Sequence, residues 1–413
     1  MRVTHSGAGA QRLAQAARSP TTTFYLLVFS NSAALTALFP LLPAFEEQFS
    51  LSKLQIGGLF AGGGLSFLLA AMPVGVLGDR LGARPVTIAG AAVLVLATLG
   101  HAVAVDFWTL AAARVILAIG SAGVLTAGVS WLSDSTLAAW RPTLIGGVIP
   151  VAAAGALAGP AVAGQLEDLY GTTVPFLVWM GVAIASLAML TVSQPGGRAR
   201  HGHTPILTML QVARAAPVVL AACLLFLIGG LAEIVVSTLT PLQLDENGLS
   251  SRDIGLVFSA GATAFLAASL TTSTAIARLG SHLVTLPAAG GAVALLAASL
   301  TPLVISTSSP AVIAAIVVRM AAIGVVYTIA FPLGATGAAS AAVGVGAVSG
   351  LLMLSSGTAN VIGPLGGAAI ASAVADRWVY LVILGLCVVT VVWTTALVRK
   401  QRTTAQRHVE TGG

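Results

Sequence analysis

Long apolar runs follow one another along the whole chain, and they constrain its fold more than any other feature of the sequence. Of the 413 residues, 57% are hydrophobic and 8% are charged, whereas a soluble domain carries roughly 25% charged residues. A helix needs about 20 consecutive apolar residues to cross the hydrocarbon core of a bilayer. The runs are continuous and do not alternate with polar residues, which argues against a membrane β-barrel. The sequence therefore predicts an all-α membrane protein with 12 transmembrane helices.

The polar segments between the runs give the expected order of domains. A polar cytoplasmic tail, residues 1–20, precedes a first bundle of six helices at 21–192. The one long polar interruption, 193–214, is expected to be a cytoplasmic linker to a second six-helix bundle at 215–398, followed by a cytoplasmic tail at 399–413. No cleavable signal peptide is expected, because the first apolar run is long enough to span. The helices are expected at about 22–45, 55–78, 86–105, 108–132, 143–165, 172–192, 215–243, 254–276, 283–303, 310–333, 341–371 and 378–398.

The distribution of charge predicts the orientation of these helices. With both termini in the cytoplasm, fourteen of the 19 Lys and Arg residues fall in cytoplasmic segments, and nine of the 13 Asp and Glu residues fall on the opposite side. This positive-inside pattern is typical of membrane helices and fits an even number of them. It also accounts for the net charge of +6 without a nucleic-acid partner. The expected location is the inner (cytoplasmic) membrane, with the lipid bilayer as surroundings.

An internal repeat is visible in four landmarks that recur in the same order. Their offsets are nearly constant, at 201, 198, 205 and 204 residues. Such a tandem repeat predicts two pseudo-symmetric six-helix bundles inserted in the same orientation. A cavity between the halves, near the middle of the bilayer, is then the default substrate site. The landmark pairs are Pro40 with Pro241, Arg80 with Arg278, Arg114 with Arg319, and Gly159–Pro160 with Gly363–Pro364.

A charged turn, residues 75–84, lies between the second and third apolar runs. It contains Gly75, Asp79, Arg80, Gly82 and Arg84. Gly75 allows close helix approach, and Gly82 can adopt the left-handed conformation that ends a helix. An ordinary basic cytoplasmic turn is the simpler interpretation. The pattern, however, resembles the loop between helices 2 and 3 of the major facilitator superfamily.

That resemblance implies roles for two carboxylates. Asp79 would meet the amino-terminal end of helix 11 in an outward-facing state, where the helix dipole attracts an anion. Asp134, at the end of helix 4, resembles the acidic partner of the turn's arginines. The family usually carries a basic residue where this chain has Ala83, so Arg84 or Arg80 would have to substitute.

Helix 5 carries a motif of small residues and a proline. Small residues permit close helix contact, and Pro160 removes a backbone hydrogen bond and bends the helix. The motif resembles that of proton-coupled antiporters in the same superfamily, and a plain kinked packing helix is the alternative. Its residues are Gly155, Gly159, Pro160 and Gly164, and a second copy in helix 11 has Gly363, Pro364 and Gly367.

Charged side chains inside apolar runs need a reason, because each costs at least roughly 2.5–3.5 kcal/mol at the bilayer centre. Glu233 is the one carboxylate in the middle of a predicted helix and is the candidate for proton coupling or for pairing with a cationic substrate. A protonated, hydrogen-bonded structural Glu is the alternative. Arg114 and Arg319 either bond to carbonyls of another helix or take part in coupling. Asn31 and Asn360 complete the candidate polar lining.

These features favour a secondary transporter: a proton-coupled exporter of small amphipathic or drug-like molecules that works by alternating access. The proton gradient would supply the energy, and no cofactor is expected. The alternative is an uptake permease for a polar metabolite with the same fold. An enzyme is not expected, since no His/Asp or Ser/His pair occurs at matching depth. Metal binding is not expected either, because Cys223 and Cys387 lie far apart. A monomer is expected.

Overall fold

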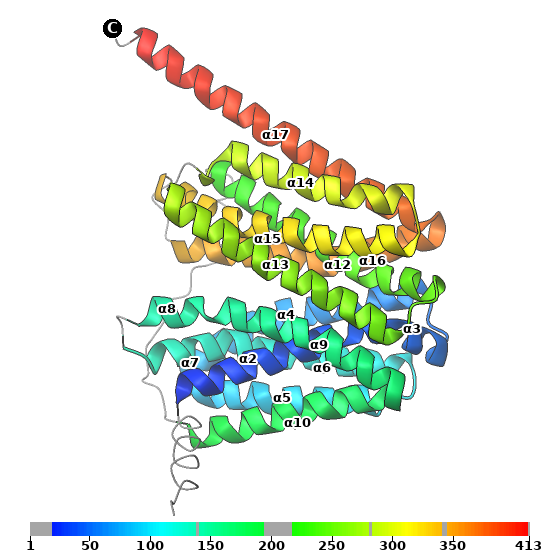
Figure 1. The fold of residues 1–413 in the computed structure, drawn as a ribbon. Coiled ribbons are helices and arrows are strands. Elements are labelled where there is room, and N and C mark those ends of the chain that lie inside the picture. Colours follow the sequence, from blue (N-terminus) through cyan, green and yellow to red (C-terminus); the bar gives the residue numbers. More distant parts are fainter. Residues whose placement is uncertain (1–18, 138–139, 194–216, 281–282, 341–344, 412–413) are drawn as a thin grey trace, which may run out of the picture. The chain divides into compact units, whose positions relative to one another are not determined.

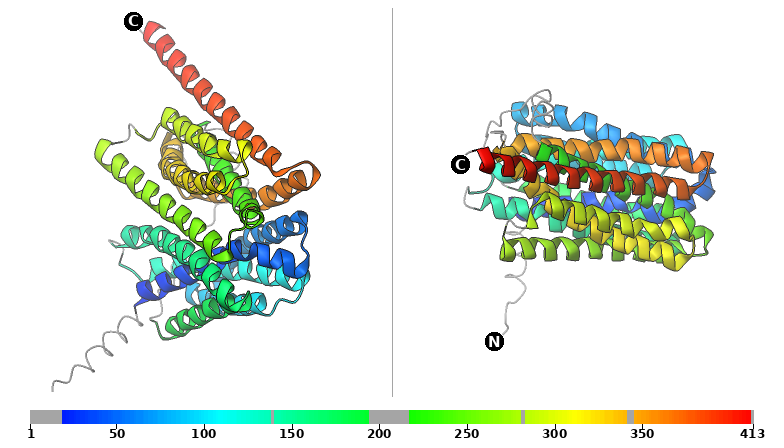
Figure 2. Two further views of the ribbon diagram at one scale, coloured as in Figure 1. Left: turned by 45° about the vertical axis from the view of Figure 1, so that its right-hand side comes forward. Right: turned by 90° about the horizontal axis from the view of Figure 1, so that it is seen from above.

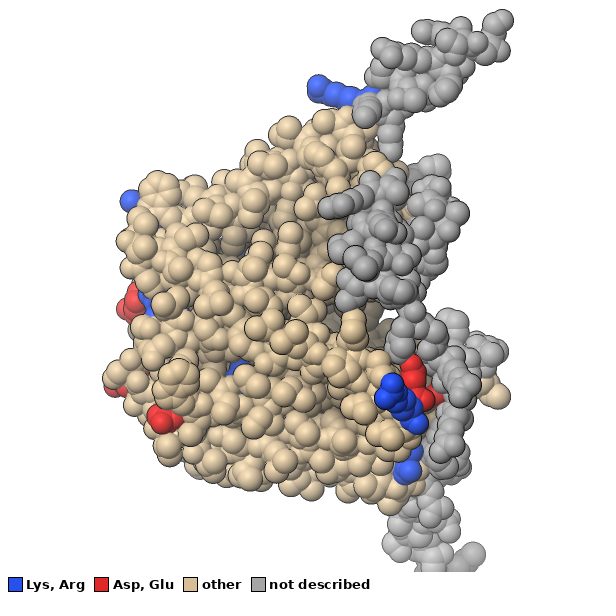
Figure 3. Space-filling view, turned by 180° about the vertical axis from the view of Figure 1, so that it is seen from behind, with Lys and Arg blue, Asp and Glu red and all other residues tan. Residues whose placement is uncertain are grey.

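The computed structural model describes residues 19–137, 140–193, 217–280, 283–340 and 345–411, and within them all regular elements are helices (Figure 1). Twelve helical segments in these ranges are long and apolar enough to cross a membrane. The predicted all-α fold with 12 transmembrane helices is therefore confirmed. On the face drawn in Figure 3, charged side chains lie toward the ends of the helices and the surface between is almost wholly uncharged.

The first half of the chain supplies six of these spans, several of them built from more than one helix. The first span divides into two helices after Thr36. Pro40 lacks the N–H that would bond to the carbonyl of Thr36 in a continuous helix. A π-helical turn interrupts the fourth span. The elements are α2 Pro20–Thr36, α3 Leu38–Phe49, α4 Lys53–Leu81, α5 Ala83–Ala102, α6 Phe107–Ala122, η1 Gly123–Ala127, α7 Gly128–Asp134, α8 Arg141–Gly146, α9 Val148–Tyr170 and α10 Thr173–Val192.

The second half supplies the other six spans as single helices. The last of them continues well past the ends of its neighbours toward the C-terminus (Figure 2). The linker expected at 193–214 and the N-terminal tail expected at 1–20 lie almost wholly outside the described residues. The elements are α12 Pro217–Glu246, α13 Ser251–Leu279, α14 Leu286–Ile305, α15 Ser309–Ser340, α16 Val345–Ala373 and α17 Asp376–Thr411.

Equivalent helices pack together in the two halves, as the repeat predicts. In the first half α2 packs on α9, and α5 packs on α6 and α10. In the second half α12 packs on α16, and α14 packs on α15 and α17. The same pairings, six helices further along the chain, confirm the predicted pseudo-symmetric bundles.

The chain forms two compact units that do not follow the halves completely. Unit 1 comprises the described parts of Met1–Leu51 and Gly62–Gly202, together with Leu249–Ser259. Unit 2 comprises Ser52–Ala61 and the described parts of His203–Gly248 and Ala260–Gly413. The starts of α4 and α13, the second helix of each half, are therefore each packed in the unit formed mainly by the other half. We call Ser52–Ala61 the α4 segment and Leu249–Ser259 the α13 segment.

Candidate functional site

Glu233 lies near the middle of α12, in unit 2, and is half-buried among apolar neighbours. Its carboxylate accepts a hydrogen bond from the Tyr327 hydroxyl of α15, with the two oxygens 3.4 Å apart. Within the described residues it forms no ion pair and no shorter hydrogen bond. A carboxylate in this position is weakly held. It is therefore available to a proton or to a cationic group.

Arg319 on α15 lies close to this carboxylate but does not pair with it. Its side chain is fully buried, with 0% exposure. Nη1 donates to the carbonyl oxygens of Ala232 and Glu233, at 3.2 and 3.3 Å. Nε and Nη2 have no hydrogen-bond partner within the described residues. A buried guanidinium with free donors can accept a carboxylate from a side chain or from a substrate.

An aromatic pair stands beside Glu233. The rings of Phe226 on α12 and Tyr327 on α15 are stacked with centroids 4.7 Å apart. A side chain at Gly229 would collide with the Tyr327 ring, so this glycine allows the ring to lie directly on α12. A carboxylate bonded to the hydroxyl of one ring of an aromatic pair is a combination that can bind an organic cation. Asn360 lies half-buried on α16, and no hydrogen bond joins it to Glu233 in the described part of the chain.

Unit 1 contains a corresponding polar set on the equivalent helices. Asn31 of α2 is fully buried and accepts a hydrogen bond of 2.7 Å from the Ser121 hydroxyl of α6. Arg114 of α6 donates from Nη1 to the carbonyl oxygen of Leu35, at 3.2 Å. Arg114 and Arg319 thus make the same kind of bond to the first helix of their own half. This is the structural role considered for them, and a direct part in proton coupling stays a prediction.

The charged turn is shorter than the sequence suggested. Asp79 and Arg80 belong to the last turn of α4, where both are exposed. Gly82 is the one residue between α4 and α5, and its φ of +97° requires a glycine. The predicted meeting of Asp79 with helix 11 is not tested by these contacts.

Arg84 has a role that the sequence did not reveal. From the first turn of α5, its Nη2 donates to the carbonyl oxygens of Leu190, Thr191 and Ser193, at 3.1, 2.8 and 3.0 Å. It thereby satisfies carbonyls at the end of α10, where a cation is favoured by the helix dipole. Asp134 ends α7 with its Oδ1 buried and without a hydrogen-bond partner in the described residues. A relay between Asp134 and the arginines stays a prediction.

The small residues of the helix-5 motif face other helices of unit 1. A side chain at Gly155 or at Gly159 would collide with main-chain carbonyls of α2. Pro160 lies inside α9, and Gly164 contacts the main chain at the start of α13. The motif therefore allows backbone-level contact, as its small residues predict.

The second copy of the motif packs in a related way in unit 2. Side chains at Gly363 and Gly367 would meet Ile234 and Val235 of α12 at 2.9 and 3.1 Å. Pro364 lies inside α16. Its carbonyl oxygen would be 2.5 Å from a Cβ at Gly57, so the α4 segment crosses α16 at the proline. The predicted gating function of either motif is not tested by this packing.

The contacts made by the first residues of α4 and α13 were not predicted, although a short sequence repeat marks both places. Residues 51–57 read Leu-Ser-Lys-Leu-Gln-Ile-Gly, and residues 249–255 read Leu-Ser-Ser-Arg-Asp-Ile-Gly. Four of the seven positions agree at an offset of 198, the offset already seen for Arg80 and Arg278. Both glycines contact the carbonyl of the motif proline, Gly57 at Pro364 and Gly255 at Pro160.

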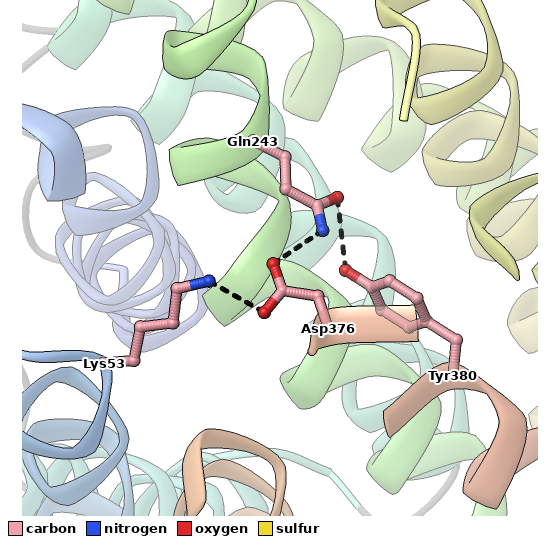
Figure 4. A network of polar contacts seen from close by, with 4 residues as sticks. All are labelled: Lys53, Gln243, Asp376 and Tyr380. Atoms are coloured by element: carbon pink, nitrogen blue, oxygen red, sulfur yellow. Dashed lines mark hydrogen bonds and ion pairs between the residues drawn. The ribbon is translucent and has the colours of Figure 1, made fainter. Parts of the chain in front are cut away.

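A polar network in unit 2 was also missed (Figure 4). Lys53, the first residue of α4, forms an ion pair of 2.8 Å with Asp376, the first residue of α17. Gln243 of α12 donates to the other oxygen of Asp376 at 2.9 Å and accepts from the Tyr380 hydroxyl at 3.3 Å. Among the described residues no group of His, Cys, Asp and Glu is arranged to hold a metal ion.

Solved structures of transporters share this fold. The chain resembles a bacterial homolog to the human lysosomal transporter Spinster, solved in an inward-facing and unoccupied conformation. The TM-score is 0.75 and the identity is 15%, over 91% of this chain and 95% of the other. It also resembles a mutant form of the nucleoside transporter NupG, with a TM-score of 0.70 and 12% identity over 92% and 99% of the two chains.

The family model of the Major Facilitator Superfamily matches residues 24–349, so the chain belongs to this superfamily. It is 33% identical over 155 residues to the probable vesicular acetylcholine transporter-B of Danio rerio, which covers 37% of this chain and 31% of that protein. It is 30% identical over 139 residues to the 3-(3-hydroxy-phenyl)propionate transporter of Escherichia coli (strain K12), covering 32% and 34%. The chain thus spans about a third of the length of the curated relatives it matches.

Proposed function

We propose that this protein is a secondary transporter that exports small amphipathic cations in exchange for protons by alternating access. Family membership supports membrane transport, because the relatives and structural neighbours of this chain are named as transporters. Secondary transport is driven by an ion or solute gradient, so the proposal includes no enzyme activity and no cofactor. The proton gradient across the inner membrane would supply the energy.

The observation that carries this proposal is the state of Glu233. It is a carboxylate in the middle of an apolar helix, and its one hydrogen bond within the described residues is a long one to Tyr327. Placing a charge there costs at least roughly 2.5–3.5 kcal/mol, so a proton or a cation is favoured as its partner. A group that binds either one, but not both, exchanges a cationic substrate for a proton.

The aromatic pair indicates the class of substrate. The rings of Phe226 and Tyr327, whose hydroxyl reaches Glu233, favour a cation with apolar bulk, because a ring and a cation attract each other when both are desolvated. Acetylcholine, which appears in the name of the relative from Danio rerio, has this chemistry. Quaternary and tertiary ammonium compounds of similar size are the first substrates to test.

The decisive experiment compares Glu233→Gln with the parent chain in proteoliposomes. With a proton gradient imposed, accumulation of the ammonium substrate should fall at least tenfold, since an amide neither binds nor releases a proton. Substrate-for-substrate exchange without a gradient should be affected less. Normal gradient-driven accumulation in Glu233→Gln would disprove the coupling role.

A matched control lies on the same helix. Glu246 is an exposed carboxylate at the end of α12, so Glu246→Gln removes the same charge without touching the middle of the membrane. It should transport as the parent does. Loss of activity in both variants would show that charge on α12, rather than Glu233 itself, matters.

A second candidate function is uptake of a small carboxylate. The free Nε and Nη2 of buried Arg319 could bind a carboxylate, and the relative from Escherichia coli is named for an aromatic propionate. The same proteoliposomes distinguish the two candidates, because an anion substrate should depend on Arg319 and survive replacement of Phe226 by leucine.

The setting proposed for this activity follows from the sequence. The chain would lie in the cytoplasmic membrane as a monomer, with both termini and the polar linker in the cytoplasm. The starts of α4, α13 and α17 would then lie on the outer side. Protease or maleimide accessibility of these segments in intact cells tests the orientation.

A further inference from the structure

The network around Asp376 is built to hold one carboxylate in a fixed place. Gln243 and Tyr380 are both nearly fully buried, with 7% and 1% exposure. Tyr380 donates to the amide oxygen of Gln243, and this leaves the amide nitrogen pointing at Asp376 (Figure 4). The orientation of the carboxylate is thus set by two side chains of the second half before any cation approaches.

The cation that completes the network comes from a different part of the chain. Lys53 is the first residue of α4, 323 residues away in sequence from Asp376. It begins the α4 segment, which packs in unit 2, whereas the rest of α4 from Gly62 onward belongs to unit 1. The ion pair therefore fixes one end of a helix that is shared between the two units.

Most of the contact made by the α4 segment carries no charge. Gly57 contacts the carbonyl of Pro364 and the Cβ of Ala368, and Ile56, Leu59 and Phe60 are buried. Apolar contact alone does not fix an end that can slide or tilt. The ion pair at Lys53 adds a directional bond to it.

We propose that Lys53 and Asp376, with Gln243 and Tyr380 as positioning residues, form an electrostatic latch that holds the α4 segment in unit 2 and is released once in each transport cycle. The latch rests on the proposed function in one respect, because alternating access requires the outer end of α4 to move. Its existence as a physical lock does not depend on what is transported.

The exposure of the ion pair suits such a role. The side chains of Lys53 and Asp376 are 30% and 16% exposed. Water that reaches a pair of this kind limits its strength, so that opening is shifted about fivefold at most. A fully buried pair would be too costly to break, and a fully exposed one would hold nothing.

Accessibility of a cysteine in the α4 segment tests the latch directly. Ala61 is buried at 2% exposure, and both native cysteines are buried, so the full-length Ala61→Cys chain is a suitable reporter. In proteoliposomes, a membrane-impermeant maleimide should label it about fivefold faster when Lys53→Met is added, since the segment then leaves unit 2 more often. Asp376→Asn should have the same effect, and the two changes combined should give no more than either alone.

Two controls separate the latch from a general loss of charge. Lys53→Arg keeps the charge and should label as slowly as the parent reporter. Arg252→Met removes a positive charge from the start of α13, where the side chain is exposed and forms no ion pair in the described residues. It should leave the Ala61→Cys reporter unchanged.

Unchanged labelling in Lys53→Met and Asp376→Asn would overturn the latch, and so would an equal rise in Arg252→Met. If Lys53→Met does not accumulate in the membrane, labelling of the parent reporter at increasing salt gives the same test. Salt screens an exposed pair, so a salt-independent rate would overturn the proposal. Labelling requires no transport, and the Glu233→Gln result is therefore read separately.

Discussion

The α4 segment and the α13 segment begin in the same way and are then fastened differently. Each starts with a serine cap. Ser52 accepts from the main-chain N–H of Gln55 at 3.2 Å, and Ser250 accepts from that of Asp253 at 3.3 Å. Each then presents a glycine to the carbonyl of a motif proline. Local structure and steric fit are thus duplicated along with the sequence.

The polar bonds beyond these shared features differ. In the α13 segment the Ser259 hydroxyl donates to the carbonyl of Leu157 at 2.7 Å, and the main-chain N–H of Arg252 donates to Asp168 at 3.3 Å. In the α4 segment the corresponding bond is the ion pair between Lys53 and Asp376. One segment is held by hydrogen bonds to a helix, and the other by a pair of charges.

The two halves therefore share a fold, while the polar contacts that hold the α4 segment and the α13 segment differ. Glycine-to-carbonyl contact is set by backbone geometry and tolerates little sequence change. A side-chain bond at the end of a helix is free to diverge, because it contributes little to packing. Opening of the two segments is therefore expected to respond to different conditions.

Adding a side chain at the glycine where a segment crosses the motif proline should reduce transport more than any other change. Gly57→Leu places a side chain against the Pro364 carbonyl, which cannot move without bending α16. We expect transport to fall more than tenfold, and the Ala61→Cys reporter to become accessible. Gly58→Leu is the control one residue away, since nothing lies within 4 Å of a Cβ there. Equal loss in both variants would mean that helix propensity rather than the crossing is at fault.

The same change in the α13 segment should be as severe. Gly255→Leu meets the carbonyl of Pro160, and we expect a similar loss of transport, with a Val257→Cys reporter becoming accessible in place of Ala61→Cys. A mild effect at Gly255 next to a severe one at Gly57 would show that the crossings are not equivalent.

Removing the hydroxyl of Ser259 should loosen the α13 segment by an intermediate amount. A typical intramolecular hydrogen bond contributes about 1 kcal/mol net. We therefore expect Ser259→Ala to increase labelling of Val257→Cys about fivefold and to leave Ala61→Cys unchanged. Increased labelling at both sites would instead indicate a general loss of stability.

Ionic strength should distinguish the segments by a smaller factor. Raising salt from about 0.01 M to about 1 M shortens the screening length from about 30 Å to about 3 Å. Labelling of Ala61→Cys should rise about twofold to threefold, within the limit set for a partly exposed pair. Labelling of Val257→Cys should change less, because the charged group that holds its segment, Asp168, is bound by a main-chain N–H and not by a cation. A common salt response would contradict the difference between the segments.

Removing a third helix cap, which lies outside both segments, should have the smallest effect on stability and serves as a reference. Thr109 donates to Asp106 from its N–H and its hydroxyl at the start of α6, both at 2.8 Å. These bonds lower the pKa of Asp106. A carboxyl whose pKa is lower in the folded state stabilises it above the unfolded pKa and loses this contribution as the pH falls through the folded one.

Asp106→Asn should therefore be slightly less stable than the parent at neutral pH, and the two should converge in acid. Thermal unfolding in detergent at several pH values measures this. Neither cysteine reporter should respond. A difference that grows on acidification would show that the stabilisation has another source.

Much of the fold could be read from the sequence because it depends on local and periodic features. Apolar length sets the number of spans, charge asymmetry predicts their orientation, and the repeat predicts equivalent pairing of helices. The small residues of the helix-5 motif predict close helix contact, and a side chain at Gly155 or Gly159 would collide with main-chain carbonyls of α2. Glu233 stood out because it is a lone carboxylate in an apolar run whose own helix carries no Lys or Arg.

Only the tertiary structure decided which groups meet. The sequence could not show that Arg84 binds the end of α10, that Arg319 bonds to carbonyls and leaves Glu233 to Tyr327, or that Lys53 reaches Asp376. Each of these is a directional contact between side chains or carbonyls far apart along the chain. Hydrophobic length and period fix where helices run, because they act on every residue of a segment. The partner of one polar atom depends on the rotation and the crossing of whole helices, which no single segment contains.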